Sequence, residues 1–370
     1  MRLTRAKRWA MLLSALTLLL VACAAPAAAP PAVPAAARAS AAANGANLAP
    51  GGSVAPAAAP AAAAPAPARL RIGFVTMAPN TLPMWMAADY GVFQKYGLDV
   101  ELTYIEGAAR IGATLVAGEI DVASGPAEVA MGPGLQGADT VAISSWAYKT
   151  GFALMGPPAI RTVADVRGKR LGVTRRGSNS EMWAGAVLSP LGLEAERDYA
   201  VLAVGGQFEQ IAALQAGSID VGVVGIPANL RGRELGFHEI LPLEQSVIDY
   251  ADVGLATTRR FLRDKPDVAE RLLRASAESV AMIFDEPEQT IATIERYSEV
   301  HDRAQLDETL AFQQLRTTRT MLPTAAGLRR VLDEIARNNP AAAGANPEDY
   351  VDLTMVRQLN DSGFIPSLAR

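Results

Sequence analysis

An internal repeat at a constant offset of 99 residues constrains this chain more than any other feature of its sequence. The tripeptide Arg-Ile-Gly at 71–73 recurs as Arg-Leu-Gly at 170–172, and AGEIDV at 117–122 recurs as AGSIDV at 216–221. Several matches at one offset indicate two units that are built in the same way. A folded part of about 300 residues is also too long for one ordinary core and usually divides into two lobes.

Each unit alternates predicted strands with predicted helices. Helices are expected at 111–117 and 210–216, and each is followed by a glycine that suits the left-handed position after a helix. The expected strands lie at 70–76, 99–104 and 120–123 in the first unit and at 170–174, 199–204 and 219–223 in the second. This alternation predicts parallel sheets covered by helices on both faces, and hence two α/β lobes.

After about residue 258 the pattern becomes helical. The expected helices lie at 261–284, 288–298, 305–319 and 325–338, with Pro266, Pro287 and Pro323 as helix-start residues. Strand-like segments at 151–156 and 252–257 flank the second unit and are the candidate hinge crossings. We therefore expect a first lobe that begins with 69–156, a second lobe at 157–251, and a return at 252–370 whose helical tail packs on the first lobe.

The first 68 residues predict a targeting signal and a tether. Residues 1–22 join a basic start to an apolar run that is shorter than a membrane span of roughly 20 residues, as in a signal peptide. The sequence Leu-Val-Ala-Cys at 20–23 resembles the bacterial lipobox, whose cysteine is lipidated, so Cys23 is the candidate lipid anchor. Residues 23–68 are rich in Ala and Pro and predict a disordered tether. A secreted protein with an incidental cysteine and a retained signal anchor are the alternatives.

Charge and composition exclude several classes of function. The net charge is −4, but residues 1–68 hold five basic and no acidic residues, so the remainder carries −9. So acidic a body is a poor candidate for binding nucleic acid through its phosphates. One cysteine excludes an intramolecular disulfide and a cysteine-based metal site, and His238 and His301 have no metal-binding spacing around them. We expect no metal and no cofactor.

The order and spacing of several motifs resemble a known family. PMWMA at 83–87 and GVFQKYGLDV at 91–100 precede AGEIDV, DVRGKRLGV at 165–173 precedes GSNS at 177–180, and SGFI lies at 362–365. Together they resemble the nitrate, sulfonate, taurine and thiamine-precursor group of extracytoplasmic solute-binding proteins. The resemblance covers nearly all of residues 69–370.

This resemblance implies a two-lobe, hinged fold of the type II periplasmic-binding class with two crossovers. It also implies a monomer that closes on a small ligand and delivers that ligand to an ABC permease with a separate ATPase subunit. The protein would then be extracytoplasmic and attached to the membrane through Cys23. Sensing through a receptor remains open, because the same body would serve either role.

An enzyme is the competing class. The motifs G-x-S-x-G, H-E-x-x-H and G-x-x-x-x-G-K-[ST] are absent from the sequence. A related branch of the family makes the thiamine pyrimidine and carries a cysteine-rich motif, whereas this chain has no cysteine after Cys23. We therefore expect no catalytic residue and no turnover. A thiamine-precursor pyrimidine or another heterocycle remains an alternative ligand.

Ligands of open α/β sheets bind beyond the carboxyl ends of the strands, next to helix N-termini. This rule selects loops and tryptophans in both lobes. The candidate ligand-binding residues are Thr76, Asn80, Trp85, Ser124, Gly125, Ser145 and Trp146 in the first lobe and Gly177, Ser178, Asn179, Ser180, Trp183, Gly225 and Pro227 in the second.

The chemistry of these residues favours an organic anion such as a sulfonate or an aromatic carboxylate. Ser178–Ser180 precede a predicted helix, whose free amides would bind an anion, although a simple N-cap explains the same residues. Arg175 and Arg176 could add positive charge or be solvated. The tryptophans suggest an aromatic wall, with core packing as the alternative.

Acidic side chains are assigned mainly structural roles. Asp121 and Asp220 occupy equivalent repeat positions and are expected to cap the turn into a short strand. Glu128, Glu181 and Asp252 could face the cleft and accept hydrogen bonds from an amino group, but we expect them to be exposed or ion-paired.

Overall fold

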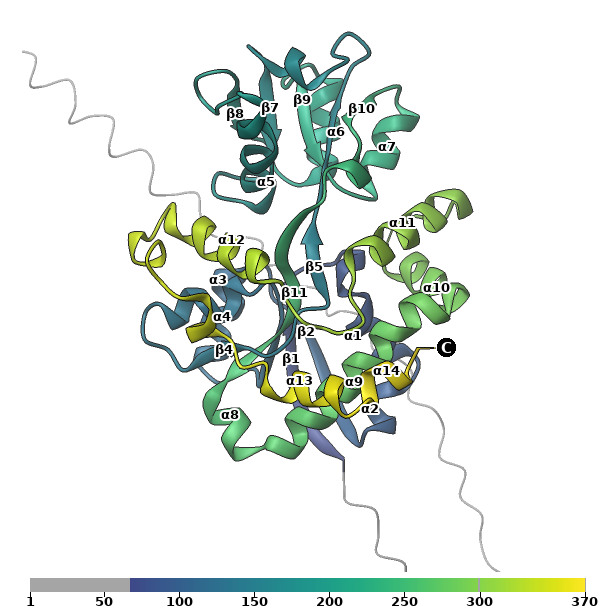
Figure 1. Ribbon diagram of the computed structural model, residues 1–370. Coiled ribbons are helices and arrows are strands. Elements are labelled where there is room, and N and C mark those ends of the chain that lie inside the picture. The colour runs from purple at the N-terminus through teal and green to yellow at the C-terminus, as the bar shows by residue number, and fades with distance from the viewer. Residues whose placement is uncertain (1–66, 299, 370) are drawn as a thin grey trace, which may run out of the picture. The chain divides into compact units, whose positions relative to one another are not determined.

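The structure is a computed structural model that describes residues 67–298 and 300–369. These residues belong to one compact unit (Figure 1). The predicted signal peptide, Cys23 and nearly all of the tether lie outside the described residues. Within the described part, no helix has the length and apolar character that crossing a membrane requires.

The first lobe is built on a six-stranded sheet. β1 runs parallel to both β2 and β3, while β11 runs antiparallel to β3, β4 and β5. Its strands are β1 (Ala68–Phe74), β2 (Leu98–Tyr104), β3 (Val122–Gly125), β4 (Thr140–Ala142), β5 (Ala147–Thr150) and β11 (Ile248–Thr258). The helices between them are α1 (Leu82–Asp89), α2 (Val92–Lys95), α3 (Ala108–Val116) and α4 (Glu128–Gly134).

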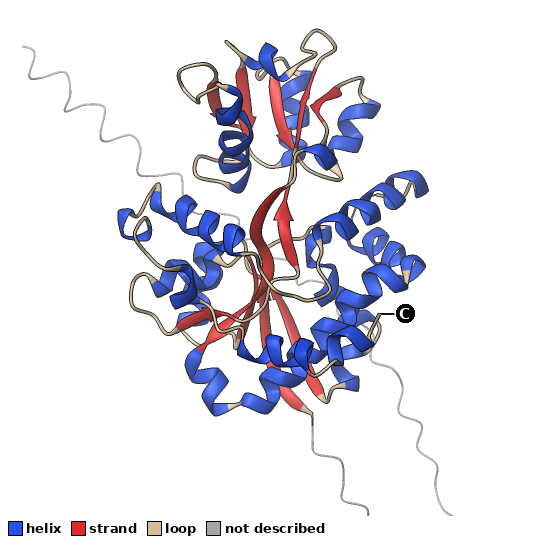
Figure 2. Cartoon of the chain, viewed as in Figure 1, coloured by secondary structure: helices blue, strands red, loops and turns tan. Residues whose placement is uncertain are grey.

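The second lobe is built on a five-stranded sheet in the order β10-β6-β9-β7-β8. β7 runs parallel to β8 and β9, and β6 runs antiparallel to β9 and β10. Its strands are β6 (Ala153–Gly156), β7 (Arg170–Val173), β8 (Ala200–Ala203), β9 (Val221–Val224) and β10 (His238–Leu241). Its helices are α5 (Asn179–Leu188), α6 (Gln207–Gln215) and α7 (Ala228–Glu234) (Figure 2).

The internal repeat corresponds to the same local construction in both lobes. Asp121 accepts hydrogen bonds from the backbone N–H of Arg71 (2.9 Å) and from its Nε (3.1 Å), and Asp220 does the same for Arg170 at 2.9 Å each. In each lobe the arginine Nη2 also donates to the carbonyl of the glycine that ends the preceding helix. These aspartates therefore tie the turn before β3 or β9 to the neighbouring strand, a structural role.

The chain after β11 is helical, as predicted. The segment expected as one helix over 261–284 is two helices, because Pro266 has no backbone N–H to donate and begins a new helix. Pro287 also starts a helix, whereas Pro323 lies just before Thr324, the residue that caps α12. The helices are α8 (Arg259–Asp264), α9 (Pro266–Asp285), α10 (Pro287–Tyr297), α11 (Arg303–Arg316), α12 (Ala325–Ala336), α13 (Thr354–Asp361) and α14 (Phe364–Ser367).

The chain crosses between the sheets twice. The first crossing, at 151–152, joins β5 of the first sheet to β6 of the second. The second joins β10 to β11, and the start of β11 pairs with β5 through Ile248 and Thr150. Figure 1 shows this pair, β5 and β11, as the strands that approach the second lobe. The two crossings therefore run next to each other.

Candidate functional site

A cavity of about 310 Å³ is lined by residues of both lobes. Residues that follow strands of both sheets line it: Thr76 is two residues after β1, and Pro126, Thr174 and Gly225 come directly after β3, β7 and β9. The topology of two α/β sheets thus brings the carboxyl ends of their parallel strands to one site, as expected for this class of sheet. The tail contributes the remaining wall through the C-terminal turn of α11.

Arg316, the last residue of α11, is a buried arginine in the wall of this cavity. It is 6% exposed and forms a buried ion pair with Asp252 of β11. The side-chain amide of Asn179 donates to the Asp252 carboxylate (3.3 Å) and to the Thr150 hydroxyl (3.2 Å). Asn179 is in the second lobe and Asp252 in the first, so this network joins the two lobes across the cavity.

Several residues in the cavity wall have polar atoms without partners. Among the described residues, Arg316 Nε, Asn179 Oδ1 and Asn80 Oδ1 are buried and have no hydrogen-bond partner. Burial lowers the pKa of Arg316 to about 10, so the guanidinium is still charged at neutral pH. Buried polar groups are nearly always satisfied in proteins, and each exception asks for an explanation such as a bound ligand. A ligand with anionic oxygens would satisfy Arg316 Nε.

The N-terminus of α5 faces the same cavity. Ser178, Asn179 and Ser180 all line it, and the Ser178 hydroxyl makes no cap hydrogen bond to the helix. Instead the Ser178 and Ser180 hydroxyls lie 2.9 Å apart, and Ser180 accepts from the Thr174 backbone N–H at 3.0 Å. The first amides of a helix have no acceptor within the helix and carry a partial positive charge. The cavity walls hold two arginines, Arg175 and Arg316, against one carboxylate, and so favour an anion.

The structure brings together six of the fourteen predicted ligand-binding residues. The residues that line the cavity are Thr76, Asn80, Ser178, Asn179, Ser180 and Gly225. The residues that do not line it are Trp85, Ser124, Gly125, Ser145, Trp146, Gly177, Trp183 and Pro227.

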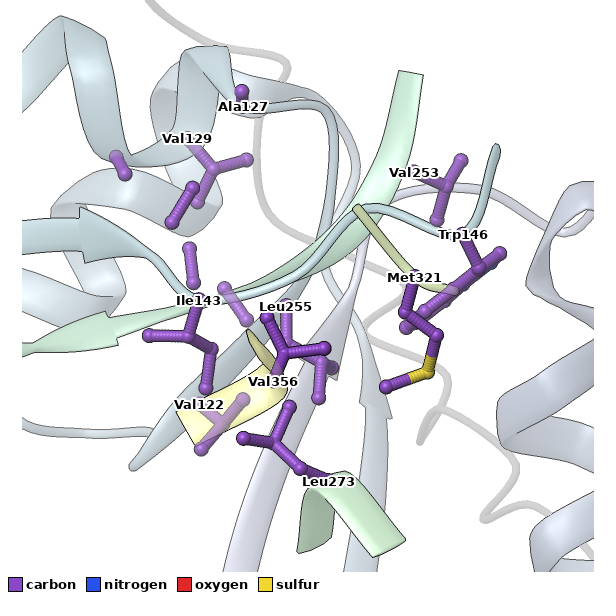
Figure 3. Close-up of a cluster of buried hydrophobic side chains, with 14 of the residues drawn as sticks. Val122, Ala127, Val129, Ile143, Trp146, Val253, Leu255, Leu273, Met321 and Val356 are labelled. Carbon is purple, nitrogen blue, oxygen red and sulfur yellow. The ribbon is translucent and has the colours of Figure 1, made fainter. Parts of the chain in front are cut away.

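The three tryptophans lie in cores, so the expected aromatic wall at the cavity is corrected. Trp85 stacks on Tyr297 with ring centroids 4.5 Å apart. Trp146 is 1% exposed and lies among the apolar side chains of the first lobe beside Met321 (Figure 3). Trp183 is fully buried and donates its Nε1–H to the carbonyl of Ser246 at 2.8 Å. The aromatic rings that do line the cavity belong to Phe152 and Phe312.

The other displaced residues lie behind or beside the cavity. Ser124 is buried in β3, and Gly125 and Ser145 pack around Gly254 of β11. Gly177 faces Asn338 in a groove outside the cavity. Pro227 precedes α7 and follows Ile226, which is itself a lining residue.

Of the three acidic candidates for the cleft, one lines the cavity and two do not. Asp252 faces the cavity and is ion-paired. Glu128 is in the groove beside α12, and Glu181 accepts a hydrogen bond from the Gly177 N–H at 2.6 Å. In the described part of the chain, the acidic, histidine and cysteine side chains form no group that could hold a metal ion.

Sequence reasoning missed the residues that the tail supplies. Arg316, Gln313 and Phe312 all lie on α11, which the periodicity correctly identified as a helix but gave only a packing role. Gln207, whose Oε1 accepts from the Gly225 N–H at 2.8 Å, was missed as well. An arginine four residues after a phenylalanine on a helix is a common pattern, and it carries no local signal of a binding site.

Comparisons with known proteins identify the family and the fold. A family model described as NMT1/THI5 like matches residues 78–290. No curated protein matches the sequence. The crystal structure of the periplasmic aliphatic sulphonate binding protein SsuA from Escherichia coli is similar, with a TM-score of 0.64 and 17% identity over 79% of this chain and 100% of that one.

Two further structures share the fold. The periplasmic nitrate-binding protein NrtA from Synechocystis PCC 6803 has a TM-score of 0.60 and 15% identity over 82% of this chain and 92% of that one. A DszB mutant in complex with biphenyl-2-sulfinic acid has a TM-score of 0.58 and 14% identity over 80% and 99% of the two chains. At these identities the likeness shows the two-lobe fold of periplasmic binding proteins.

Proposed function

The chain belongs to the NMT1/THI5-like family, and on this premise we propose that it is an extracytoplasmic solute-binding protein for a small organic anion. The ligand enters between the lobes, contacts both, and shifts the equilibrium toward the closed form by its higher affinity for that form. The closed form then delivers it to an ABC permease that works with a separate ATPase. The ligand class proposed is a sulfonate or an aromatic carboxylate.

One observation carries this proposal. A buried arginine at the end of α11, with an unpartnered Nε, lies in the same cavity as the N-terminus of α5. Helix amides and a guanidinium are the two groups that proteins use most readily to hold anionic oxygens. SsuA is a sulphonate-binding protein and NrtA is a nitrate-binding protein, and both support an anion as the ligand of this chain.

Binding without turnover is the proposal, and an enzyme is the alternative. DszB, in complex with a sulfinic acid, shares the fold, so the fold alone does not separate the two classes. The single cysteine of the chain is Cys23, which leaves the cysteine-rich motif of the pyrimidine-synthase branch without a counterpart. A pyrimidine ligand would place its ring against Phe152 or Phe312 and would need no anionic group.

The test replaces Arg316 in the full-length chain and measures binding by calorimetry. With ethanesulfonate and benzoate as probes, Arg316→Gln should weaken binding about ten- to a hundredfold, because a charge-assisted hydrogen bond is lost. The control Arg303→Gln, at the exposed start of the same helix, should bind as the parent does. Arg316→Gln leaves the buried Asp252 carboxylate without its partner, which could destabilise the fold. The double variant Arg316→Gln/Asp252→Asn also removes that charge, so weak binding by a stable double variant reports loss of binding and not loss of folding. If both Arg316 variants bound ethanesulfonate and benzoate as tightly as the parent does, Arg316 would not be part of the binding site.

The proposal also includes the N-terminal anchor, with residues 1–22 as a signal peptide, Cys23 as the lipidated residue and the segment to residue 68 as a tether. The lipobox-like sequence at 20–23 supports it. Expressed in a bacterium, the chain should fractionate with membranes, and Cys23→Ser should release it or leave the signal peptide uncleaved. A Cys23→Ser protein that is processed and retained like the parent would argue against lipidation.

A further inference from the structure

We infer that a second cavity beside the first binds the apolar part of the ligand, so that the ligand is an amphipathic anion. This inference rests on the proposed function, because it assumes that the first cavity binds the anionic group of the ligand and assigns a place to the rest of the ligand. The second cavity has a volume of about 850 Å³ and lies between α7 and β10 of the second lobe and α11 of the tail. The head cavity, at about 310 Å³, is much smaller.

The two cavities meet at two side chains. Ile226 and Phe312 line both of them. On α11, Phe312 lies one turn before Arg316, and its ring centroid is 5.7 Å from the guanidinium carbon. Leu315 lines the second cavity only. One helix therefore presents a cation to the head cavity, an aromatic ring at the junction and an aliphatic side chain beyond it.

The surface of the second cavity is mainly apolar, although Arg233, His238, Glu239, Glu244 and Glu308 also line it. Phe237, Pro242, Leu243 and Leu315 contribute apolar surface. The cation in the wall, Arg233, is already paired with Glu308 and lies 3.8 Å from Glu239. Leu315 is 39% exposed although it is a large apolar residue, so covering it with an alkyl chain or ring would remove apolar surface from water.

A bare inorganic anion would use only part of this arrangement. Such an anion would satisfy Arg316 and the α5 N-terminus and leave the larger cavity to water. An anion with a chain or ring directed past Phe312 would fill both cavities. Cavities of this size with apolar walls and a few polar groups are typical of sites for organic ligands.

The test is a homologous series of linear alkanesulfonates, titrated into the full-length chain by calorimetry. From ethanesulfonate through hexanesulfonate to decanesulfonate, affinity should rise by up to about fourfold per added methylene group until the cavity is full. Leu315→Asp should abolish this gain with chain length. Leu315→Trp should end the gain at a shorter chain. Leu191→Asp changes a leucine that is 60% exposed and outside both cavities, and is the matched control.

The outcomes separate this inference from the proposed function. Ethanesulfonate binding with no dependence on chain length overturns the second site and leaves the anion-binding function in place. A chain-length gain that neither Leu315 variant alters overturns the location. No binding at any chain length by folded protein overturns both proposals. Equal binding of alkyltrimethylammonium ions of the same lengths would overturn the anionic head.

Discussion

Gly254 is the residue at which the first sheet allows no side chain at all. It lies in β11 opposite the segment that leads from β4 to β5. A Cβ built on it would fall against the carbonyl oxygen of Ser144 and within 2.6 Å of the Ser145 Cα. These are backbone atoms, so the neighbour cannot rotate away as a side chain could. The close approach of two backbones, and not a positive φ, therefore requires glycine here.

Replacing Gly254 should destabilise the protein more than an ordinary core change. Gly254→Ala is expected to cost more than about 3 kcal/mol, because relief of the clash must move a strand. The matched control is Gly185→Ala on α5, where the nearest atom to a Cβ is the Arg337 Nη2 at 3.6 Å and helix propensity predicts a gain of up to about 1 kcal/mol. Chemical denaturation would measure both. Similar stability in the two variants would show that the segment at Ser144 yields easily.

Among the elements, α12 carries a carboxyl group in an unusual environment. Glu334 is 9% exposed, and neither of its oxygens has a hydrogen-bond donor in the described part of the chain, although Arg337 Nε lies 3.1 Å away. Burial raises the pKa of Glu334 to about 7; Arg337 opposes this shift, and the nearby Glu128 and Glu181 add to it. These residues come from α4, α5 and α12, so packing of three helices creates the environment.

This environment predicts a pH dependence of stability with a definite sign. A carboxyl whose pKa is near 7 when folded and near 4.5 when unfolded makes the folded state bind more protons between those values. Stability therefore falls as the pH rises from about 4.5 to about 7. Glu334→Gln should remove this fall and exceed the parent at pH 8 by roughly 1 to 3 kcal/mol.

Urea denaturation at pH 5 and pH 8 would check this prediction. The control Asp333→Asn, on the same helix with an exposed carboxylate, should retain the pH dependence of the parent. If Glu334→Gln loses stability between pH 5 and pH 8 as steeply as the parent does, Glu334 is not the group that titrates.

At the scale of the whole molecule, polar contacts join the lobes outside the cavity of about 310 Å³. Arg233 on α7 pairs with Glu308 on α11, and the side-chain amide of Gln305 donates to Glu234 at 2.5 Å. α7 belongs to the second lobe and α11 packs on helices of the first. Separation of the lobes would break both contacts, so they favour the arrangement of the lobes that the structure shows.

Loss of the Arg233–Glu308 ion pair should weaken the proposed binding of ethanesulfonate slightly, although neither residue lines the cavity that holds Arg316. Glu308→Gln is expected to raise the dissociation constant of ethanesulfonate by up to about fivefold, because exposed ion pairs contribute at most about 1 kcal/mol. The effect should shrink at high salt. Glu288→Gln is the control, since its pair with Arg303 joins α10 to α11 within one lobe. Equal effects of the two substitutions would show that the Arg233–Glu308 pair does not act on closure.

Local sequence patterns were enough to predict the two α/β units, the helical tail and several loops that line the candidate cavity. The offset of 99 residues, the strand and helix periodicities and the helix-start prolines are local signals, and the structure confirms the fold that they predict. The rule that ligands bind at strand ends then led to Thr76, Asn80 and Ser178–Ser180 without any knowledge of packing.

Which side chains of those loops and helices face the cavity depends on how the elements pack in three dimensions. The tryptophans stand near strand ends in the chain, yet their large apolar surfaces are most stable in the cores. Arg316 meets Asp252, 64 residues earlier, and Asn179 meets Asp252 from 73 residues away. Contacts over such separations depend on how whole elements pack, and a helix pattern cannot report which partner its last turn will meet.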